Sequence, residues 1–456
     1  MAAHTSLAMP VEGAAHHATV LFGMDPLWVA TSVLILAYAF IVSERLNRAI
    51  ISMLGAGLMI FLGVLNQEQA INGIDFNTLF LLIGMMAIVS ITRRTGVFQF
   101  VAIYCARAVK GNPRALLAVL AWITAVFSAL LDNVTTVMLI VPVTLLLTDQ
   151  LKISAYPFLF SQIFASNIGG TATLIGDPPN ILIGSAVGFS FMDFVYNVGP
   201  ASLVIMVALT VIFDVVWGRK MVADPALKQR LSDYQPAEAL SDVPLLWKSL
   251  FTIGLVLLGF IAGHGHGYEP GTIALTGAAF LMLLECWKFP VEQQSHKVHD
   301  VFTKVEWETI FFFLGLFILV YGVESAGLLE ILARKLMALT QGDIEMTGII
   351  ILWSSAIFSA IVDNIPFVAT MIPLISSTAG DFGGAENLEP LWWCLSLGAC
   401  LGGNGTLVGA SANVMVSSFA ERAGQRIAFL TFMKGAFPLM LVTIAMAHVY
   451  VLWAFF

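Results

Sequence analysis

The chain carries three blocks of small and polar residues twice, in the same order. The pattern Thr-x5-Gly-x11-Gly begins at residues 78 and 309, a separation of 231. Ser-Ala-x-x-Asp-Asn, followed nine residues later by Pro, begins at 128 and 359. Gly-Gly-x-x-Thr-Leu-x-Gly-x-x-x-Asn begins at 169 and 402, a separation of 233. Three matched blocks with one two-residue slip indicate an internal duplication, so we expect a fold built from two copies of one unit.

The duplicated blocks lie in a chain that is 59% hydrophobic and only 11% charged, whereas soluble domains are about 25% charged. Apolar runs long enough to cross a bilayer recur along nearly its whole length, which predicts an all-α polytopic membrane protein. The formal net charge of −8 is spread thinly and indicates no nucleic-acid partner. The four cysteines form no CxxC pair or zinc spacing, so we expect no metal site and no bound cofactor.

The polar centres of the second and third blocks decide how the chain crosses the bilayer. Irregular backbone at membrane depth survives only where it is buried in protein or lines a polar cavity. We therefore expect 114–149 and 346–377 to be re-entrant hairpins, and 156–186 and 390–419 to be broken helices. Each repeat then has five transmembrane helices plus one re-entrant hairpin. Five crossings per repeat is an odd number, so the two repeats are inverted relative to each other.

The cations support this topology. With the N-terminus outside, every Lys and Arg of the 21 in the chain except Arg334 and Lys335 falls on the inside, as the positive-inside rule requires. Full crossings at both hairpins would move the cations of the linker outside and break the rule. The expected organisation is an extracytoplasmic tail (1–24), a first repeat (25–218), a cytoplasmic linker (219–247) and a second repeat (248–456), with both termini extracytoplasmic.

Inverted repeats with discontinuous helices place a transport site near the midplane, where half-helix ends and unwound carbonyls meet the solute. Glycine permits close backbone approach there, and Thr, Ser and Asn side chains both donate and accept hydrogen bonds. The predicted substrate-binding residues are Asn133, Thr135, Thr136, Gly169, Gly170, Thr171, Thr173, Asn180, Asn364, Gly402, Gly403, Asn404, Thr406, Ser411 and Asn413.

Three acids lie in the same segments, and an intramembrane carboxylate is costly and usually functional. We predict Asp132, Asp177 and Asp363 as ion-coupling residues, with H+ as the coupling ion and Na+ as the alternative. Neither the hairpin tips (132–136 and 363–366) nor the helix breaks (166–180 and 399–413) contain Lys or Arg. Three carboxylates with no fixed cation suit a proton, a metal cation or a neutral solute better than a dianion. The counterpart of Asp177 is Ala410, so the site is not symmetric in charge.

Structural interpretations compete with these. Glycine and serine in membrane helices often mediate tight helix packing, and Asp177 before two prolines could cap the following half-helix. Cys400, beside the second break, reads as a small buried thiol. The duplication of acid, amide and glycine at matching positions favours a translocation site.

The segments 169–180, 363–373 and 397–413 resemble the ion transporter superfamily, which includes the ArsB, NhaD and divalent-anion symporter families, and within it the P-protein-like ArsB branch. The resemblance covers roughly residues 25–455. It implies a scaffold domain, a transport domain that moves like an elevator, and a homodimer. Asp132-Asn133-Val134 and Asp363-Asn364-Ile365 stand where the symporters carry Ser-Asn-Thr, a departure that puts the symporters' sodium and dicarboxylate sites in doubt.

The resulting prediction is a secondary transporter of the cell inner membrane, a proton-coupled antiporter that exports arsenite or antimonite. The resemblance also implies a peripheral ATPase subunit in some members. A sodium/proton antiporter or an organic-anion transporter of the same fold is the alternative, and a passive channel or an intramembrane enzyme is the distant one. The chain has no HExxH, GxSxG or GxGD motif.

Overall fold

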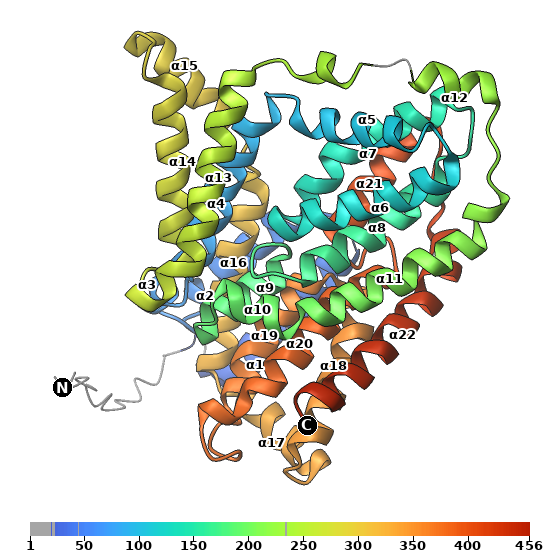
Figure 1. The fold of residues 1–456 in the computed structure, drawn as a ribbon. Helices are drawn as coiled ribbons and strands as arrows, with labels where there is room; N and C mark the ends of the chain where they lie inside the picture. The colour runs from blue at the N-terminus through green and yellow to red at the C-terminus, as the bar shows by residue number, and fades with distance from the viewer. Residues whose placement is uncertain (1–19, 21–22, 44, 233–234) are drawn as a thin grey trace, which may run out of the picture.

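The computed structural model describes residue 20 and residues 23–43, 45–232 and 235–456. The predicted extracytoplasmic tail lies almost wholly outside these described residues. Within the described part the chain forms α-helices and short 3-10 turns and no strand. The all-α fold class is therefore confirmed (Figure 1).

The first repeat contains two long hairpin arms and one broken helix among its spans. Its helices are α1 (Pro26–Ser43), α2 (Arg48–Phe61), α3 (Gln67–Asn72), α4 (Phe76–Arg93), α5 (Val97–Ala108), α6 (Pro113–Leu130), α7 (Asn133–Gln150), α8 (Tyr156–Thr171), α9 (Pro178–Val187), α10 (Phe191–Asn197) and α11 (Gly199–Val216).

The second repeat has the same plan. After α12 (Pro225–Ser232) in the linker come α13 (Val243–Gly263), α14 (Pro270–Cys286), α15 (Val291–Phe302), α16 (Trp307–Ser325), α17 (Leu328–Thr340), α18 (Ile344–Val362), α19 (Asn364–Ser376), α20 (Glu389–Gly402), α21 (Ser411–Arg422) and α22 (Phe429–Ala454). Helix α13 begins at Val243, within the predicted linker (219–247).

Helix length alone miscounts the crossings. Nine helices of the described residues are long and apolar enough to span a membrane, and they include the hairpin arms α6, α7 and α18. The set omits α2 and α14, which have only 14 and 17 residues, and both broken helices. The interruptions at Asp132 and Asp363, rather than length, identify the hairpins.

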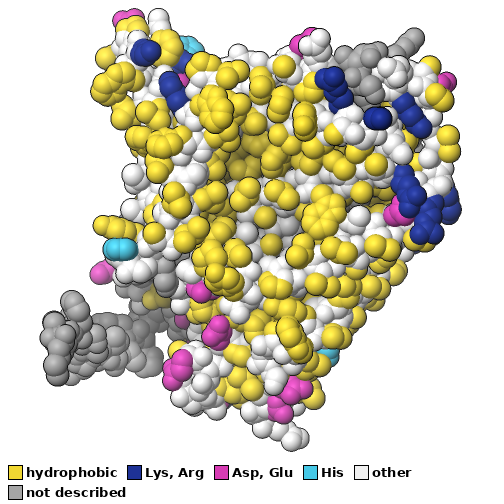
Figure 2. Space-filling model, in the orientation of Figure 1, with side chains coloured by type: hydrophobic (Ala, Val, Ile, Leu, Met, Phe, Trp, Pro, Cys, Tyr) yellow, Lys and Arg dark blue, Asp and Glu magenta, His cyan; other side chains and the backbone are white. Residues whose placement is uncertain are grey.

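The two hairpins enter from opposite ends of the molecule. At one end, Arg114 at the start of α6 pairs with Asp214 near the end of α11, and the N–H of Ala155, just after α7, donates to Gln425, which follows α21. At the other end, the start of α18 lies against Phe456. The repeats are therefore inverted, as predicted. On the face drawn in Figure 2, Lys and Arg gather in the half that carries α12 and α15, and apolar side chains cover the flank.

In one part of the fold, here called the scaffold (α1, α2, α4, α13, α14 and α16), helices of one repeat pack on helices of the other. Helix α2 packs on α16, and α14 packs on α4. The first glycine in each copy of the Thr-x5-Gly-x11-Gly block makes one of these contacts. A side chain on Gly84 would strike the backbone of Ala274, and one on Gly315 would strike the backbone of Ser52. The first block of the duplication is thus a packing signature.

Each repeat also contributes a matching half to the transport bundle (α6–α9, α11 and α18–α22). Helix α6 packs along α8, and α18 along α20. Gly169 and Gly402 sit at these crossings, where a Cβ would collide with the backbone of Ala125 and of Ala356. Ser128 and Ser359 then donate across the same crossings to the carbonyls of Ser166 and Ala399, at 2.5 and 2.6 Å. The halves of the bundle are built alike.

Candidate functional site

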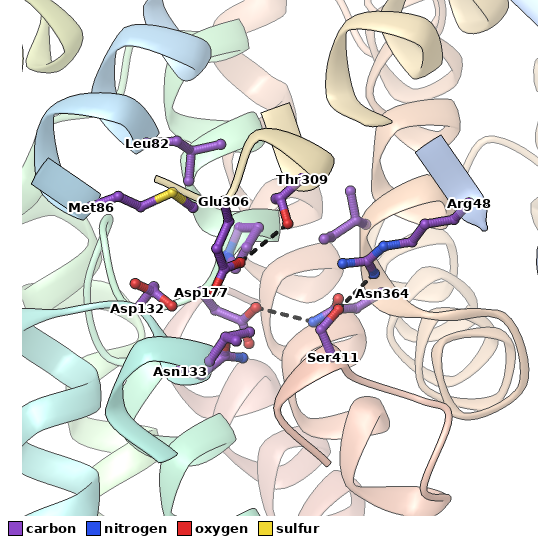
Figure 3. A pocket seen from close by; sticks show the side chains of 13 residues that line it. Arg48, Leu82, Met86, Asp132, Asn133, Asp177, Glu306, Thr309, Asn364 and Ser411 are labelled. Atoms are coloured by element: carbon purple, nitrogen blue, oxygen red, sulfur yellow. Dashed lines mark hydrogen bonds between the residues drawn. The ribbon is translucent and has the colours of Figure 1, made fainter. Parts of the chain in front are cut away.

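The two hairpin tips and the two helix breaks converge on one small buried space, with the scaffold closing its side (Figure 3). Its room for solvent is about 20 Å³, which is about the size of a single water molecule. Its lining is Arg48, Leu82, Met86, Asp132, Asn133, Val134, Asp177, Pro178, Glu306, Thr309, Asn364, Ile365 and Ser411. Five of the predicted site residues, Asp132, Asn133, Asp177, Asn364 and Ser411, lie among them.

An asparagine closes each break. The amide nitrogen of Asn180 donates to the carbonyls of Thr171 and Thr173 at 3.0 and 2.9 Å. In the second repeat, Asn413 donates to the carbonyls of Gly403 and Thr406 at 2.7 and 2.8 Å. Buried carbonyls that have lost their helical partners must be satisfied in another way. These side chains therefore hold the unwound backbone, and neither is among the residues that line the central space.

The hydroxyls of the breaks donate hydrogen bonds to backbone carbonyls, and the glycines pack against backbone atoms. Thr173 donates to the Ala129 carbonyl and Thr406 to the Ala360 carbonyl, both at 2.6 Å, which ties each break to its own hairpin. The Thr171 hydroxyl donates to the carbonyl of Asn167. Gly170 and Gly403 pack against the backbone of Gly176 and Gly409. These positions shape the site from behind.

A chain of amides crosses between the repeats. Asn133 of the first tip donates to Asn167 of α8 at 3.2 Å, and Asn167 donates at 3.1 Å to both Asn404 and Asn413 of the second repeat. The position matching Asn167 in the second repeat is Cys400, whose thiol donates to the side-chain amide oxygen of Asn180 at 3.5 Å. Asn167 was not among the predicted site residues, although it lies beside the first Gly-Gly pair.

Asp177 is the most isolated acid of the site. It is fully buried, one oxygen accepts the Asn364 amide at 3.1 Å, and the other has no hydrogen-bond partner among the residues that the structure describes. It stands at the start of α9 but makes no capping hydrogen bond, which excludes the helix-cap interpretation in this conformation. A buried carboxylate oxygen left unpaired is costly, so this position is suited to taking up a proton or a cation.

The two tip acids are held differently. Asp132 caps α7 by accepting the backbone N–H of Thr135 at 2.7 Å, and it also accepts the Thr135 hydroxyl. Asp363 has a backbone φ of +86° and only a 3.4 Å contact to the N–H of Ile365. Thr136 follows Thr135 in the tip that Asp132 caps. It is buried, and its hydroxyl has no hydrogen-bond partner among the described residues.

Two scaffold residues complete the site, and the sequence reasoning missed both. Arg48, the first residue of α2, donates to Asp363 at 2.9 Å and to Ser411 at 2.7 Å. Glu306, just before α16, accepts the Thr309 hydroxyl at 3.2 Å. The expectation of a site with no fixed cation was therefore wrong. Arg48 lies outside the hairpin tips and the helix breaks, 315 residues from Asp363 in the sequence, next to the short charged connection between α1 and α2.

Two larger cavities lie at opposite ends of the scaffold–bundle boundary. One, of about 830 Å³, reaches Arg48, Asp363 and Ser411 and continues past Glu308 to Arg422. The other, of about 550 Å³, is lined by Asp75, Asn77, Glu269 and Glu324 among others and reaches none of the central residues. The site thus communicates with one end of the molecule and is closed from the other.

No group of three or more His, Cys, Asp or Glu side chains in the described part of the chain has the geometry to hold a metal ion. The carboxylates around the central space are therefore not arranged as a preformed metal cage.

Comparison with known proteins decides the family. The model of the citrate transporter family matches residues 38–398. The chain belongs to this family. The match covers both hairpins and the first broken helix, and it ends within the second.

Three relatives each match 93% of the chain. The chain is 40% identical to a 46 kDa membrane protein of Mycobacterium leprae over 93% of its own length and 98% of the relative's. It is 39% identical to an uncharacterized transporter of Mycobacterium tuberculosis over 93% and 97%. It is also 31% identical to the human P protein over 93% of the chain, which spans 60% of that protein. The resemblance to the P-protein branch of the superfamily is confirmed.

Solved structures share the fold. The YdaH transporter of Alcanivorax borkumensis superposes with a TM-score of 0.61 at 12% identity, over 94% of this chain and 98% of that one. MtrF of Neisseria gonorrhoeae, described as one of a class of antimetabolite efflux pumps, gives 0.58 at 9% identity, over 95% of each chain. This member of the citrate transporter family is a polytopic membrane transporter and not an enzyme.

Proposed function

We propose that the chain is a proton-coupled antiporter that exports arsenite or antimonite. The supporting observation is the charge around the central space. Asp132, Asp177 and Glu306 line it and Asp363 adjoins it, whereas Arg48 is the one cation among its lining residues. Carboxylates that outnumber their cations in a buried site favour uptake of protons or small cations.

The size of the space supports a small solute. Room for about one water leaves a tricarboxylate no place in this conformation, and a neutral trihydroxide such as As(OH)₃ would need a smaller expansion than a tricarboxylate. Its hydroxyls would meet side chains that both donate and accept, Asn133, Asn364 and Ser411. A neutral solute also brings no anionic charge to an acid-rich site.

The architecture supports alternating access by an elevator motion. The site lies between two bodies, the scaffold and the transport bundle, and only one of the two end cavities reaches it. Movement of the bundle along the scaffold would carry the tips from one cavity to the other. We further propose an inner-membrane location with both termini extracytoplasmic, a homodimer, and an optional peripheral ATPase subunit.

One observation favours a second candidate, an organic-anion transporter. Arg48 offers a guanidinium to carboxylate groups, it faces the cavity of about 830 Å³, and the family description names citrate. Sodium is the alternative coupling ion in either case.

Flux in proteoliposomes separates these functions. Purified protein is reconstituted without sodium, and arsenite movement is followed under an imposed pH gradient of either sign. The proposal predicts arsenite flux that reverses with the gradient and is unaffected by sodium. Citrate uptake without arsenite movement would establish the second candidate, and flux of either solute that ignores the pH gradient would exclude proton coupling. A matched liposome preparation carrying Asp177→Asn is the control for leakage.

A further inference from the structure

The second hairpin tip is bonded to the scaffold by two polar contacts. Arg48 of α2 reaches Asp363 and Ser411 with the same terminal nitrogen, at 2.9 and 2.7 Å. Tyr38 of α1 donates its hydroxyl to the carbonyl of Pro366 at 2.7 Å. The Arg48 guanidinium also lies 5.0 Å from the centre of the Phe312 ring of α16, so the scaffold holds the cation in place on its own side.

The first hairpin tip has no equivalent. The Asp132 carboxylate accepts hydrogen bonds only from Thr135 of its own tip among the described residues. The helix that corresponds to α2 in the second repeat is α14, which begins with Pro270 and carries no cation in its first turn. The contact between Arg48 and Asp363 is therefore specific to one repeat and is not a by-product of the duplicated fold.

The backbone of Asp363 also departs from that of its counterpart. Asp132 has φ −88° and ψ 158°, the ordinary conformation of a helix cap, whereas Asp363 has φ +86° and ψ 142°. A residue other than glycine is rarely held at positive φ unless its surroundings compensate. The compensation visible here is the ion pair, since Asp363 keeps only a 3.4 Å capping contact and directs its other oxygen to Arg48 and Ser411.

We propose that Arg48 is a positioning residue whose ion pair with Asp363 latches the second hairpin tip to the scaffold, and that protonation of Asp363 releases the latch. This inference rests on the proposed proton coupling. The latch would link the charge state of the site to the freedom of the bundle to move, because an elevator motion must separate Arg48 from Asp363.

The charged groups around the pair set the sign of the pH dependence. Arg48, Glu306, Glu308 and Arg422 line the same cavity as Asp363. Asp132 and Asp177 line the adjoining central space together with Arg48 and Glu306. The ion pair exists while Asp363 is ionised, because a neutral carboxyl group carries no charge to attract the guanidinium. Acidification therefore weakens the latch, and neutral or alkaline pH strengthens it.

Hydrogen exchange at the tip measures the latch without any substrate. The full-length protein in lipid nanodiscs is labelled at pH 4 and pH 8, because the ordinary pKa of an aspartate is about 3.9. The peptide over residues 361–372 is followed by mass spectrometry after correction for the intrinsic pH dependence of exchange. We expect exchange in the wild type to be slow at pH 8 and about tenfold or more faster at pH 4, the change expected when a charge-assisted hydrogen bond between partly buried groups is lost.

Variants distinguish a latch from a merely structural contact. Arg48→Gln and Asp363→Asn should exchange fast at both pH values, whereas Arg48→Lys should restore part of the protection and of the pH response. Tyr38→Phe should raise exchange equally at both pH values, because a phenol–carbonyl bond does not titrate in this range. Arg45→Gln, which removes an exposed cation three residues away, should behave as the wild type.

Slow exchange in Arg48→Gln at pH 8, or a wild-type tip that ignores pH, would overturn the latch. The flux assay is independent of this result. Arsenite flux driven by a pH gradient together with a pH-insensitive tip would refute the latch and leave the proposed function standing. A pH-sensitive tip without arsenite flux would support the latch and refute the proposed substrate.

Discussion

The first broken helix, α8–α9, and the second, α20–α21, are held by the same device and differ in what they present to the solute. In each, the third residue of the second half-helix is an asparagine whose amide bonds two or more carbonyls of the break. The first break, however, places Asp177 at the centre, where the second has Ala410. Asn167 of α8 likewise corresponds to Cys400 of α20.

The hairpin tips repeat this contrast. Asp132 is bonded within its own tip, whereas Asp363 is bonded across the domain boundary to Arg48. Duplication therefore accounts for the frame and for the two tip acids, whereas Asp177 and the contact from Arg48 occur in one half only. We expect these unequal charges to give the two halves different tasks in transport.

Substitutions at matching glycines of the two repeats should lower the stability of the protein by similar amounts. Gly169→Ala and Gly402→Ala each force a Cβ into the backbone of the neighbouring helix, and we expect each to cost about 3 kcal/mol or more of stability. Thermal unfolding in detergent, followed by size-exclusion chromatography, would measure the loss. Gly254→Ala, at a helical position with no neighbour within 4 Å, is the matched control and should be neutral. Unequal damage at 169 and 402 would break the structural equivalence of the halves.

Substitutions at Asp177 and at its counterpart Ala410 should change the proton-coupled flux by different amounts. Asp177→Asn keeps the shape of the side chain and removes the buried, half-unpaired carboxylate, so we expect proton-coupled flux to fall about a hundredfold or more. Thermal stability should stay unchanged or rise, because an unsatisfied buried charge is removed. Ala410→Asn places the same amide at the symmetry-related position and should retain most of the flux. Equal loss in both variants would contradict the assignment of coupling to the first break.

The tip acids should differ by a smaller factor. Asp363→Asn removes the partner of Arg48, and we expect about a tenfold change in flux with a flattened pH profile. Asp132→Asn leaves a side chain that can still cap α7 through its carbonyl oxygen, so its effect should be about threefold or less. The pH dependence of initial rates between pH 5.5 and 8 checks both. Transport that stays fully pH-coupled in either variant would remove that acid from the coupling role.

The smallest expected effect tests the hydroxyls behind the tips. Ser128→Ala and Ser359→Ala each remove one hydrogen bond to a buried carbonyl, and each should lower stability by about 1 kcal/mol without changing the pH profile. Thermal unfolding and flux measured on the same preparations would show it. A shift of the pH profile in only one of the two variants would mean that the asymmetry of the site includes the serines behind the hairpin tips.

Much of this arrangement could be predicted from the sequence, for reasons that differ between residues. The duplicated blocks specify close backbone contacts at Gly84, Gly169 and Gly402, and such contacts tolerate little else, so they leave a readable pattern. The acids at 132, 177 and 363 stand out because they interrupt apolar runs. Helix α2 and helix α14 also follow from hydropathy, although each is too short to be counted by length alone.

The missing parts lie where spatial proximity leaves no local signal. Arg48 begins α2 three residues after Arg45, and nothing near it in sequence points to a site on a hairpin tip 315 residues away. Glu306 follows a charged loop in the same way. Its relation to Thr309 matches that of Asp75 to Thr78 in the first repeat, so the threonine of the first block, read together with the acid three residues before it, could have identified Glu306.

The most direct test of the unequal site is the charge moved when arsenite is added. Export of a neutral solute in exchange for protons is electrogenic, so a rapid arsenite jump over proteoliposomes on a solid-supported membrane should evoke a transient current in the absence of sodium. The account predicts a current in the wild type and in Ala410→Asn and none in Asp177→Asn. A full current in Asp177→Asn, or a wild-type protein that carries arsenite with no charge movement, would contradict it.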